Sequence, residues 1–196
     1  MKIAVNVRLL IKNKLDGIGN FTYEVLKRIT TAHPEHRFIF IFDRKYDDEF
    51  IFSDNIIPVV GLPPARHPFL WYVFFEATIP LIFTRYRPDL FLSPDGFLSL
   101  NAKVPSLPVI HDLNFIYYPE FLPRLHSKYY RTFFPKYIRK SFRIATVSEY
   151  SKSDIIKLYN IDPGKIDVVY NGANEKFKPL PYEEQQKIRE KFTGGS

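Results

Sequence analysis

Residues 144–170, IATVSEYSKSDIIKLYNIDPGKIDVVY, contain one complete strand–helix–strand unit. The stretches 144–147 and 165–170 contain Ile, Val and Thr and are typical of strands, whereas residues 149–160 carry apolar side chains at helical spacing. Two strands that are joined by a helix lie parallel, because a parallel pair needs a long crossover connection. The stretch therefore predicts an α/β protein that is built on a parallel sheet.

The same alternation of strand and helix patterns continues through the rest of the chain. The run RFIFIF at residues 37–42 is apolar after its first residue, as expected for a strand that is covered on both faces. Further strands are predicted at residues 2–8, 56–60, 89–92 and 106–111. Helices are predicted at residues 20–32, 124–142 and 181–192, and residues 68–86 are expected to be helical in part. These elements predict a doubly wound parallel sheet of about seven strands.

Length and composition indicate a single folded domain without cysteine chemistry. The chain has 196 residues, of which 45% are hydrophobic and 25% charged, so intrinsic disorder is excluded. The absence of cysteine excludes disulfides, thiolate catalysis and cysteine-ligated zinc. The net charge of +7 favours phosphate-bearing partners, namely nucleotides, nucleic acid or anionic lipid.

The sequence predicts neither a membrane span nor a secretory signal. The longest apolar stretch, residues 71–83, is interrupted by Glu76 and Pro80. The chain begins directly with the strand-like MKIAV at residues 1–5. We therefore expect a cytoplasmic protein.

A loop with two glycines, DGIGN at residues 16–20, connects the first strand to the first helix. Gly17 and Gly19 allow backbone N–H groups to approach an anion at the helix N-terminus, and Asn20 is a suitable N-cap. The dinucleotide fingerprint is incomplete, because Thr22 takes the place of its third glycine and the loop begins well after the strand. We predict that Gly17, Gly19 and Asn20 contact a phosphate or sugar, which is favoured over an NAD site, and a plain glycine turn at the surface is the alternative.

Further polar residues follow predicted strands, where ligands bind in a doubly wound sheet. Asp43 stands where a ribose-binding acid would lie, although a turn former is the simpler interpretation. The His111 imidazole can donate or accept a proton near neutral pH, and Asp112 either caps the next turn or orients the ring. We predict His111 and Asp112 as the catalytic residues. The remaining histidines show no metal-ligand spacing, so no metal site is predicted at His33, His36, His67 or His126.

Residues 122–143 carry basic side chains and no acidic one. Aromatic and aliphatic residues recur between them at helical spacing, so the segment predicts an amphipathic helix, which Pro135 should kink or split. The basic side is either a solvated surface or a contact surface for anionic lipid or a pyrophosphate-bearing acceptor. No nucleic-acid-binding motif is present, so nucleic acid is not a predicted partner. The residues that we assign to an acceptor or membrane surface are Arg124, Lys128, Arg131, Lys136, Arg139 and Lys140.

Two polar turns complete the candidate residues. Ser148 is placed to cap the helix at 149–160, and Glu149 suits the first turn of that helix. Asn171 and Gly172 are a turn signal after the last strand, so they should face the same crevice. We predict that these four residues contact substrate or phosphate, although capping alone explains Ser148.

Three stretches of the sequence resemble the N-terminal half of family 4 glycosyltransferases, the group 1 type of GT-B enzymes. They are DGIGNFTYEVL at residues 16–26, HDLNFIYYPEF at residues 111–121 and TVSEYSKSDIIKLYNIDPGKIDVVYNGANEKFKP at residues 146–179. The resemblance extends over residues 1–179. It is specific to the superfamily and does not identify a sugar.

The resemblance implies two Rossmann-like domains that face a cleft, of which the N-terminal one binds the acceptor. Residues 1–180 would form that Rossmann-like domain, and residues 181–196 a closing helix and the start of the interdomain linker. The C-terminal domain, which binds a nucleotide sugar such as GDP-mannose or a UDP-sugar, is expected to be absent here, so this chain alone should have little transferase activity. The family retains anomeric configuration and commonly needs no metal or other cofactor.

The resemblance also implies roles for individual residues. Gly17 and Gly19 match the loop that approaches the donor phosphate or the acceptor. His111 matches the cleft histidine near the reacting sugar carbon, and Asn171 and Gly172 match the turn before the hinge. The implied enzyme is mannosyltransferase-like, acts on a glycan or lipid-linked acceptor, and lies in the cytoplasm, peripheral to the inner membrane face. Two alternatives stay open, a stand-alone nucleotide- or phosphate-binding module and an NAD(P)-dependent oxidoreductase fragment, which the loop length and the missing glycine disfavour.

Overall fold

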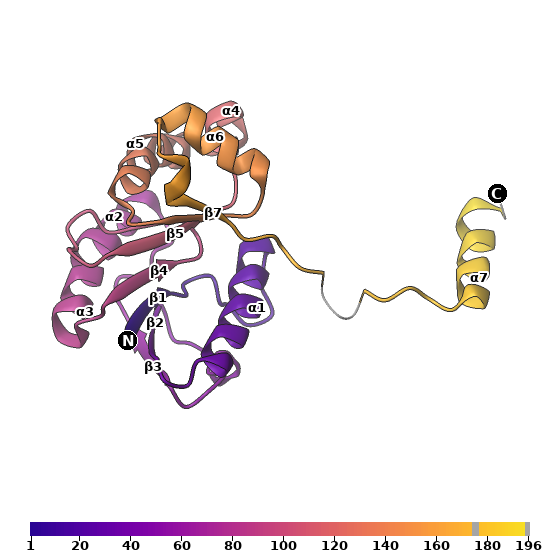
Figure 1. Cartoon of the computed structure of the whole chain (residues 1–196), viewed down its shortest axis with the longest axis horizontal. Coiled ribbons are helices and arrows are strands. Elements are labelled where there is room, and N and C mark those ends of the chain that lie inside the picture. The colour runs from indigo at the N-terminus through magenta and orange to yellow at the C-terminus, as the bar shows by residue number, and fades with distance from the viewer. Residues whose placement is uncertain (174–176, 195–196) are drawn as a thin grey trace.

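The computed structural model of the chain describes residues 1–173 and 177–194. Parallel strands form one seven-stranded sheet in the order β3-β2-β1-β4-β5-β6-β7 (Figure 1). The strands are β1 (Lys2–Asn6), β2 (Arg37–Phe42), β3 (Ile56–Val60), β4 (Leu90–Ser93), β5 (Ser106–Ile110), β6 (Ile144–Thr146) and β7 (Ile166–Val168). The order is the Rossmann order with one added strand, so the predicted α/β class and doubly wound parallel sheet are confirmed.

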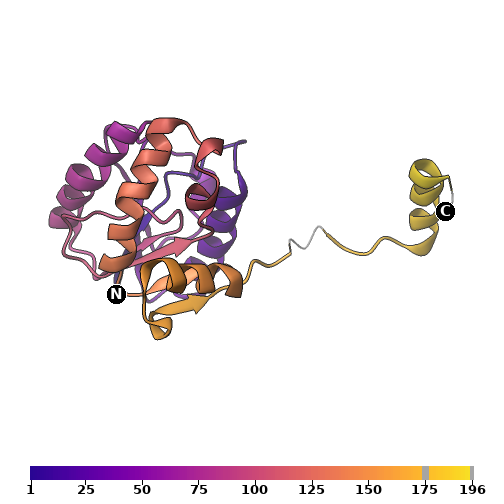
Figure 2. The same cartoon turned by 90° about the horizontal axis from the view of Figure 1, so that it is seen from above.

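Helices cover both faces of the sheet (Figures 1 and 2). Strand β2 shows why, because its side chains alternate between two hydrophobic clusters. The phenylalanines Phe38, Phe40 and Phe42 pack with Leu26 of α1 (Gly17–Ala32). Ile39 and Ile41 belong to the cluster on the other face. That cluster includes residues of α2 (Pro68–Val73), α3 (Ile79–Tyr86), α5 (Arg124–Lys140) and α6 (Glu149–Tyr159).

Residues 68–86, for which the sequence predicts helix only in part, are helical throughout. A five-residue π-helical segment, η2 (Phe74–Thr78), joins α2 to α3. Its Glu76 is 9% exposed, and its carboxylate oxygens accept from the N–H groups of Leu100 and Asn101, both at 2.9 Å. Lys140 donates to three carbonyls of the same loop, at residues 99, 100 and 102. The two side chains of opposite charge therefore clamp the loop that leads into β5.

Three helices differ from what the sequence predicts. Helix α1 begins at Gly17, because the Asp16 carboxylate, and not Asn20, caps it by accepting from the Gly19 N–H at 2.7 Å. Pro135 lies inside α5 without splitting it, since the buried side chains on either side of it hold both halves against the core. The final helix, α7 (Tyr182–Thr193), has no buried residue and lies apart from the sheet in both views, so it does not close the domain (Figures 1 and 2). The segment predicted for the closing helix and linker, residues 181–196, ends outside the described residues. No helix in the described ranges is long and apolar enough to cross a membrane.

An aromatic cluster surrounds the single tryptophan of the chain. Trp71 makes edge-on contacts with Phe97, Tyr129 and His126, with ring centroids 4.9–5.2 Å apart. The Nδ1 atom of His126 is buried and has no hydrogen-bond partner in residues 1–173 and 177–194. Burial, and then the neighbouring His67, lower the pKa of His126 below its ordinary value.

This lowered pKa predicts a loss of stability in mild acid. The folded chain holds His126 neutral, whereas the unfolded chain binds a proton there as the pH falls below about 6.5. The contribution of His126 is therefore fully present above that pH and is lost as the pH falls toward the lower, folded pKa. Between pH 7 and pH 5, the urea midpoint should fall less in His126→Phe than in the unchanged chain. Equal falls would show that His126 does not contribute.

Candidate functional site

The carboxyl ends of β1 and β4 meet where the strand order reverses, which is the place where doubly wound sheets bind ligands. Asn6 ends β1, and its amide nitrogen donates to the Ser93 hydroxyl at 3.1 Å and to the Asp95 carboxylate at 2.7 Å. Ser93 ends β4 and also donates to Asp95, at 3.0 Å. The segments that follow these two strands are therefore joined directly across the reversal.

A buried ion pair lies next to these hydrogen bonds. The Arg8 Nε donates to an Asp95 carboxylate oxygen at 2.5 Å, and both side chains are less than one-tenth exposed. The guanidinium carbon of Arg8 lies 4.3 Å from the centre of the Phe97 ring. Burial alone would lower the pKa of Arg8, but the attraction of Asp95 and further neighbours raises it above the ordinary value. Neither Arg8 nor Asp95 is among the residues predicted for the site, although each is a charged residue close to the end of an apolar strand.

Asp43, at the end of β2, belongs to the same buried region. Its carboxylate accepts two hydrogen bonds from Arg44, at 2.6 and 2.8 Å, and one from the Ala65 N–H at 2.8 Å. Arg8 donates to the Ala65 carbonyl at 3.2 Å. Asp43 is fully buried, so it is neither a ribose-binding acid nor a simple turn former. It holds the loop that leads into α2.

His111 follows β5 and lies beside the N-terminal end of α1. Its Nε2–H donates to the Pro94 carbonyl at 2.8 Å, because a carbonyl can only accept. The neutral ring then carries its lone pair on Nδ1, which has no hydrogen-bond partner among the described residues. The Phe21 ring meets the imidazole edge-on, with centroids 5.0 Å apart. The ring is therefore oriented by two contacts, which leave Nδ1 without a partner in the described part of the chain.

The neighbours of His111 position it through the backbone. The Asp112 carboxylate accepts from the Asn114 N–H at 2.9 Å, so it caps the turn into α4 (Asn114–Tyr117) and does not orient the imidazole. Ser148 caps α6 as predicted, accepting from the Ser151 N–H at 3.1 Å. The Ser151 hydroxyl donates to the His111 carbonyl at 3.0 Å, whereas Glu149 is exposed on the first turn. Ser148 thus fixes the first turn of α6, and Ser151 on that turn holds the His111 backbone.

A cavity of about 360 Å³ opens beside His111. Asp95, His111 and Asp112 provide charged or titratable groups in its wall. The aromatic residues of the wall are Phe115, Tyr118, Phe121, Tyr130 and Phe134. A ligand with polar groups toward His111 and an apolar portion toward the rings matches this lining.

The glycine loop at the start of α1 has a different environment. The Gly19 N–H is used by Asp16, and the Asn20 amide donates to the carbonyls of Leu15 and Asp16 at 3.3 and 3.0 Å. A Cβ on Gly19 would meet the Leu9 carbonyl at 3.1 Å, so the close packing of the loop favours glycine there. The Asp16 carboxylate therefore occupies part of the place where we expected a phosphate.

Four predicted residues do come together in a second cavity. Gly17 and Asn20 of α1 face Asn171 and Gly172, which follow β7, across a groove of about 660 Å³. Glu24, Arg28, Tyr170 and Phe177 also line it. The predicted turn signal is thus placed beside the predicted loop.

The predicted basic surface is divided by the structure. Arg124, Lys128 and Arg131 line a groove of about 610 Å³ along the N-terminal half of α5. Lys136 and Arg139 are exposed further along the helix. Lys140 leaves this surface for the loop clamp described above, where burial lowers its pKa.

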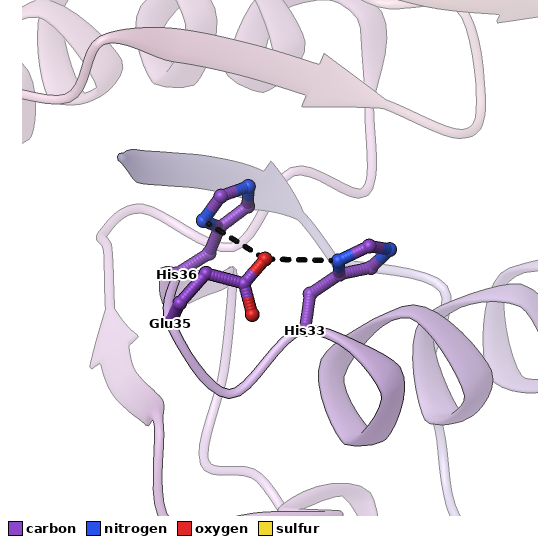
Figure 3. A group of neighbouring side chains, drawn as sticks. All are labelled: His33, Glu35 and His36. Carbon is purple, nitrogen blue, oxygen red and sulfur yellow. Dashed lines mark hydrogen bonds and ion pairs between the residues drawn. The ribbon is translucent and has the colours of Figure 1, made fainter.

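The expectation that the remaining histidines show no ligand spacing is wrong for one pair. The turn between α1 and β2 brings His33, Glu35 and His36 together, so that one nitrogen or oxygen atom from each lies within 4.8 Å of the others (Figure 3). This group precedes β2, whereas His111 follows β5. It therefore lies at the opposite edge of the parallel sheet from His111.

The comparisons with known proteins agree with this architecture. The model of Glycosyltransferase Family 4 matches residues 15–177. The O-antigen chain mannosyltransferase RfbU of Salmonella typhimurium is 33% identical over 124 residues, which are 62% of this chain and 33% of that protein. A glycosyltransferase from Rickettsia africae ESF-5 superposes with a TM-score of 0.55 at 20% identity, over 100% of this chain and 50% of that one. Anabaena HepE, solved with UDP and glucose, gives 0.55 at 15% identity, over 98% and 50%.

The two solved structures show the fold alone at these identities, and this chain spans about half of their length and a third of RfbU. The family model, by contrast, covers well over half of this chain and includes α1, His111 and the turn at Asn171 and Gly172. The chain therefore belongs to glycosyltransferase family 4.

Proposed function

We propose that this chain is the acceptor-binding half of a glycosyltransferase, whose active site is completed by a half that binds a nucleotide sugar. The observation that carries the proposal is the aromatic cavity at His111, in a chain that belongs to a glycosyltransferase family. The alternatives have less support. The Asp16 carboxylate occupies the N-terminus of α1, where a dinucleotide phosphate would bind. Asp43 is hydrogen-bonded to Arg44 and to the Ala65 N–H, so it is not free to bind the ribose of NAD(P).

The cavity supports an amphipathic acceptor, such as a lipid-linked glycan. Its aromatic wall would hold an apolar portion of the acceptor or stack against sugar rings. The polar side, at His111, would face the hydroxyl groups of the acceptor sugar. A free hydroxyl-rich sugar would leave much of the aromatic wall in contact with water, so the apolar portion should contribute to affinity.

In the proposed transfer, the acceptor hydroxyl oxygen bonds to the anomeric carbon while the bond from that carbon to the nucleotide phosphate breaks. The hydroxyl proton passes to the leaving phosphate. His111 would accept a hydrogen bond at Nδ1 from a second hydroxyl of the acceptor, because Nε2 is already held by Pro94, and would so orient the reacting hydroxyl with its own proton toward the phosphate. Among residues 1–173 and 177–194, no carboxylate is hydrogen-bonded to the His111 ring, since Asp112 accepts from the Asn114 N–H instead, so the arrangement does not suggest a carboxylate nucleophile beside His111. Retention of configuration and independence of metal stay predictions.

The similarity to the mannosyltransferase RfbU supports mannose as the transferred sugar, and a nucleotide-linked mannose as the donor. HepE, whose fold is similar, was solved with UDP and glucose, so a UDP-sugar is the second candidate. We also propose that the enzyme works in the cytoplasm at an anionic membrane face. Arg124 and Lys128 are exposed on α5, close in sequence to Tyr118 and Phe121, whose exposed rings stack with centroids 5.4 Å apart.

Replacement of His111 tests the proposed role of the ring. In a transfer-competent protein that contains this chain, His111→Ala should lower kcat by at least about 100-fold, because the acceptor hydroxyl loses its positioning group. The acceptor KM should change much less. The measurement is steady-state transfer from the nucleotide sugar, and His67→Ala is the histidine control. An unchanged kcat with an intact fold would contradict the role of His111.

Ligand binding to the 196-residue chain tests the acceptor assignment. A detergent-solubilised polyprenyl diphosphate sugar should raise the melting temperature and shift the fluorescence emission of Trp71. The centre of the Trp71 ring lies 5.9 Å from that of Tyr130, which lines the cavity. UDP, GDP and NAD should cause little shift. Phe121→Ser should weaken acceptor binding by about tenfold, whereas Phe69→Ser, which also removes an exposed phenylalanine, should not. A strong response to NAD would revive the oxidoreductase alternative.

A matched pair of charge reversals tests the membrane proposal. Arg124→Glu with Lys128→Glu should weaken binding to vesicles of anionic lipid by at least about 30-fold, because each lost cation near the surface removes about 1 kcal/mol. Lys136→Glu with Arg139→Glu makes the same charge change further from the stacked rings and should weaken binding less. Co-sedimentation with vesicles measures both. Equal effects of the two pairs would leave only a general effect of net charge, and no effect of either would overturn the proposal.

A further inference from the structure

The four residues His33-Pro34-Glu35-His36 bring three potential metal ligands to one point (Figure 3). The His33 Nδ1 lies 3.0 Å from the Glu35 Oε1, and the His36 Nδ1 lies 3.7 Å from the same oxygen. A tetrahedral ion with bonds of about 2.0–2.1 Å requires neighbouring ligand atoms to lie about 3.4 Å apart. The two distances lie on either side of that value, and the three ligand atoms all lie within 4.8 Å of one another, so side-chain rotations would bring them to the spacing that an ion requires.

The backbone holds this turn without help from the three side chains. The His33 N–H donates to the Ile29 carbonyl at 3.1 Å and so ends α1, and the His36 N–H donates to the His33 carbonyl at 3.1 Å and closes the turn. Pro34 restricts the intervening residue. The Asn55 amide donates to the His33 carbonyl at 3.0 Å, from the loop before β3. A ligand set on such a turn loses little conformational freedom when an ion binds.

The electrostatic environment favours a cation. The C-terminal end of α1 carries a partial negative charge, and the group lies directly at that end. The Glu35 carboxylate faces both histidines and places a negatively charged ligand atom between them. The His36 Nδ1 is shielded from solvent, and at 3.7 Å from the carboxylate it has no hydrogen-bond partner among the described residues.

We propose that His33, Glu35 and His36 form a binding site for a divalent transition metal of the zinc type, with one coordination position left for water or an added ligand. Two imidazole nitrogens and one carboxylate oxygen suit Zn²⁺ or Ni²⁺, whereas Mg²⁺ and Ca²⁺ prefer oxygen ligands. The ion would tie the end of α1 to the start of β2, away from His111.

The test uses the full 196-residue chain, free of any histidine tag and stripped with a chelator. Titration with Zn²⁺ against a chromophoric competitor should show one saturable site per chain and a raised melting temperature. His36→Ala and Glu35→Gln should each weaken the binding by more than about 100-fold, because loss of an outer partner alone costs 10–100-fold. His67→Ala is the control and should leave the binding unchanged, as should an excess of Mg²⁺.

Imidazole ¹⁵N signals of the unchanged chain give a second measurement that needs no variant. Addition of one equivalent of Zn²⁺ should shift the Nδ1 signals of His33 and His36 and leave those of His67 and His111 in place. Absence of saturable binding, equal affinity in the variants, or shifts at other histidines alone would overturn the proposal. None of these results depends on transferase activity, so the outcome is separate from that of the proposed function.

Discussion

The buried pair of Arg8 and Asp95 is the constraint on which the candidate site depends. Removing two charges from water is expensive, and their attraction offsets that cost only when the other hydrogen-bonding positions are filled. Here Asp95 also accepts from Asn6, Ser93 and the Phe97 N–H, while Arg8 lies over an aromatic ring and donates to Ala65. The segments after β1 and β4 are thereby fixed to each other, and the cavity beside His111 forms against this fixed edge.

Much of the fold could be predicted because each strand leaves a local pattern. The run at residues 37–42 indicates burial on both faces, and the structure places its phenylalanines against α1 and its isoleucines against the opposite layer. Helix ends were harder to predict, since Asp16 and Asn20 are equally good caps by residue type. The structure makes the choice, because the Asp16 carboxylate accepts from the Gly19 N–H while the Asn20 amide donates to carbonyls of the preceding loop.

The site divides in the same way. His111 could be found because it directly follows an apolar strand, and the turn at Asn171 and Gly172 for the same reason. Arg8 and Asp95 are 87 positions apart, so no local pattern joins them. Lys140 is predicted on the basic surface but binds the loop at residues 99–102. Helical spacing indicates on which side of a helix a residue lies, but not which loop packs against that side. The group at His33 was missed because its ligands meet only through the turn geometry.

The two outermost strands have a consequence for the behaviour of the protein at high concentration. An open sheet offers unpaired backbone groups at its edges, which can template aggregation between copies. Here one edge strand, β3, contains Pro58, which has no N–H to donate. The other edge strand, β7, is only three residues long. Its Asp167 is paired with Arg143, the residue directly before β6. Neither edge is a long regular template, so a domain rich in aromatic residues is protected against edge-to-edge polymerisation.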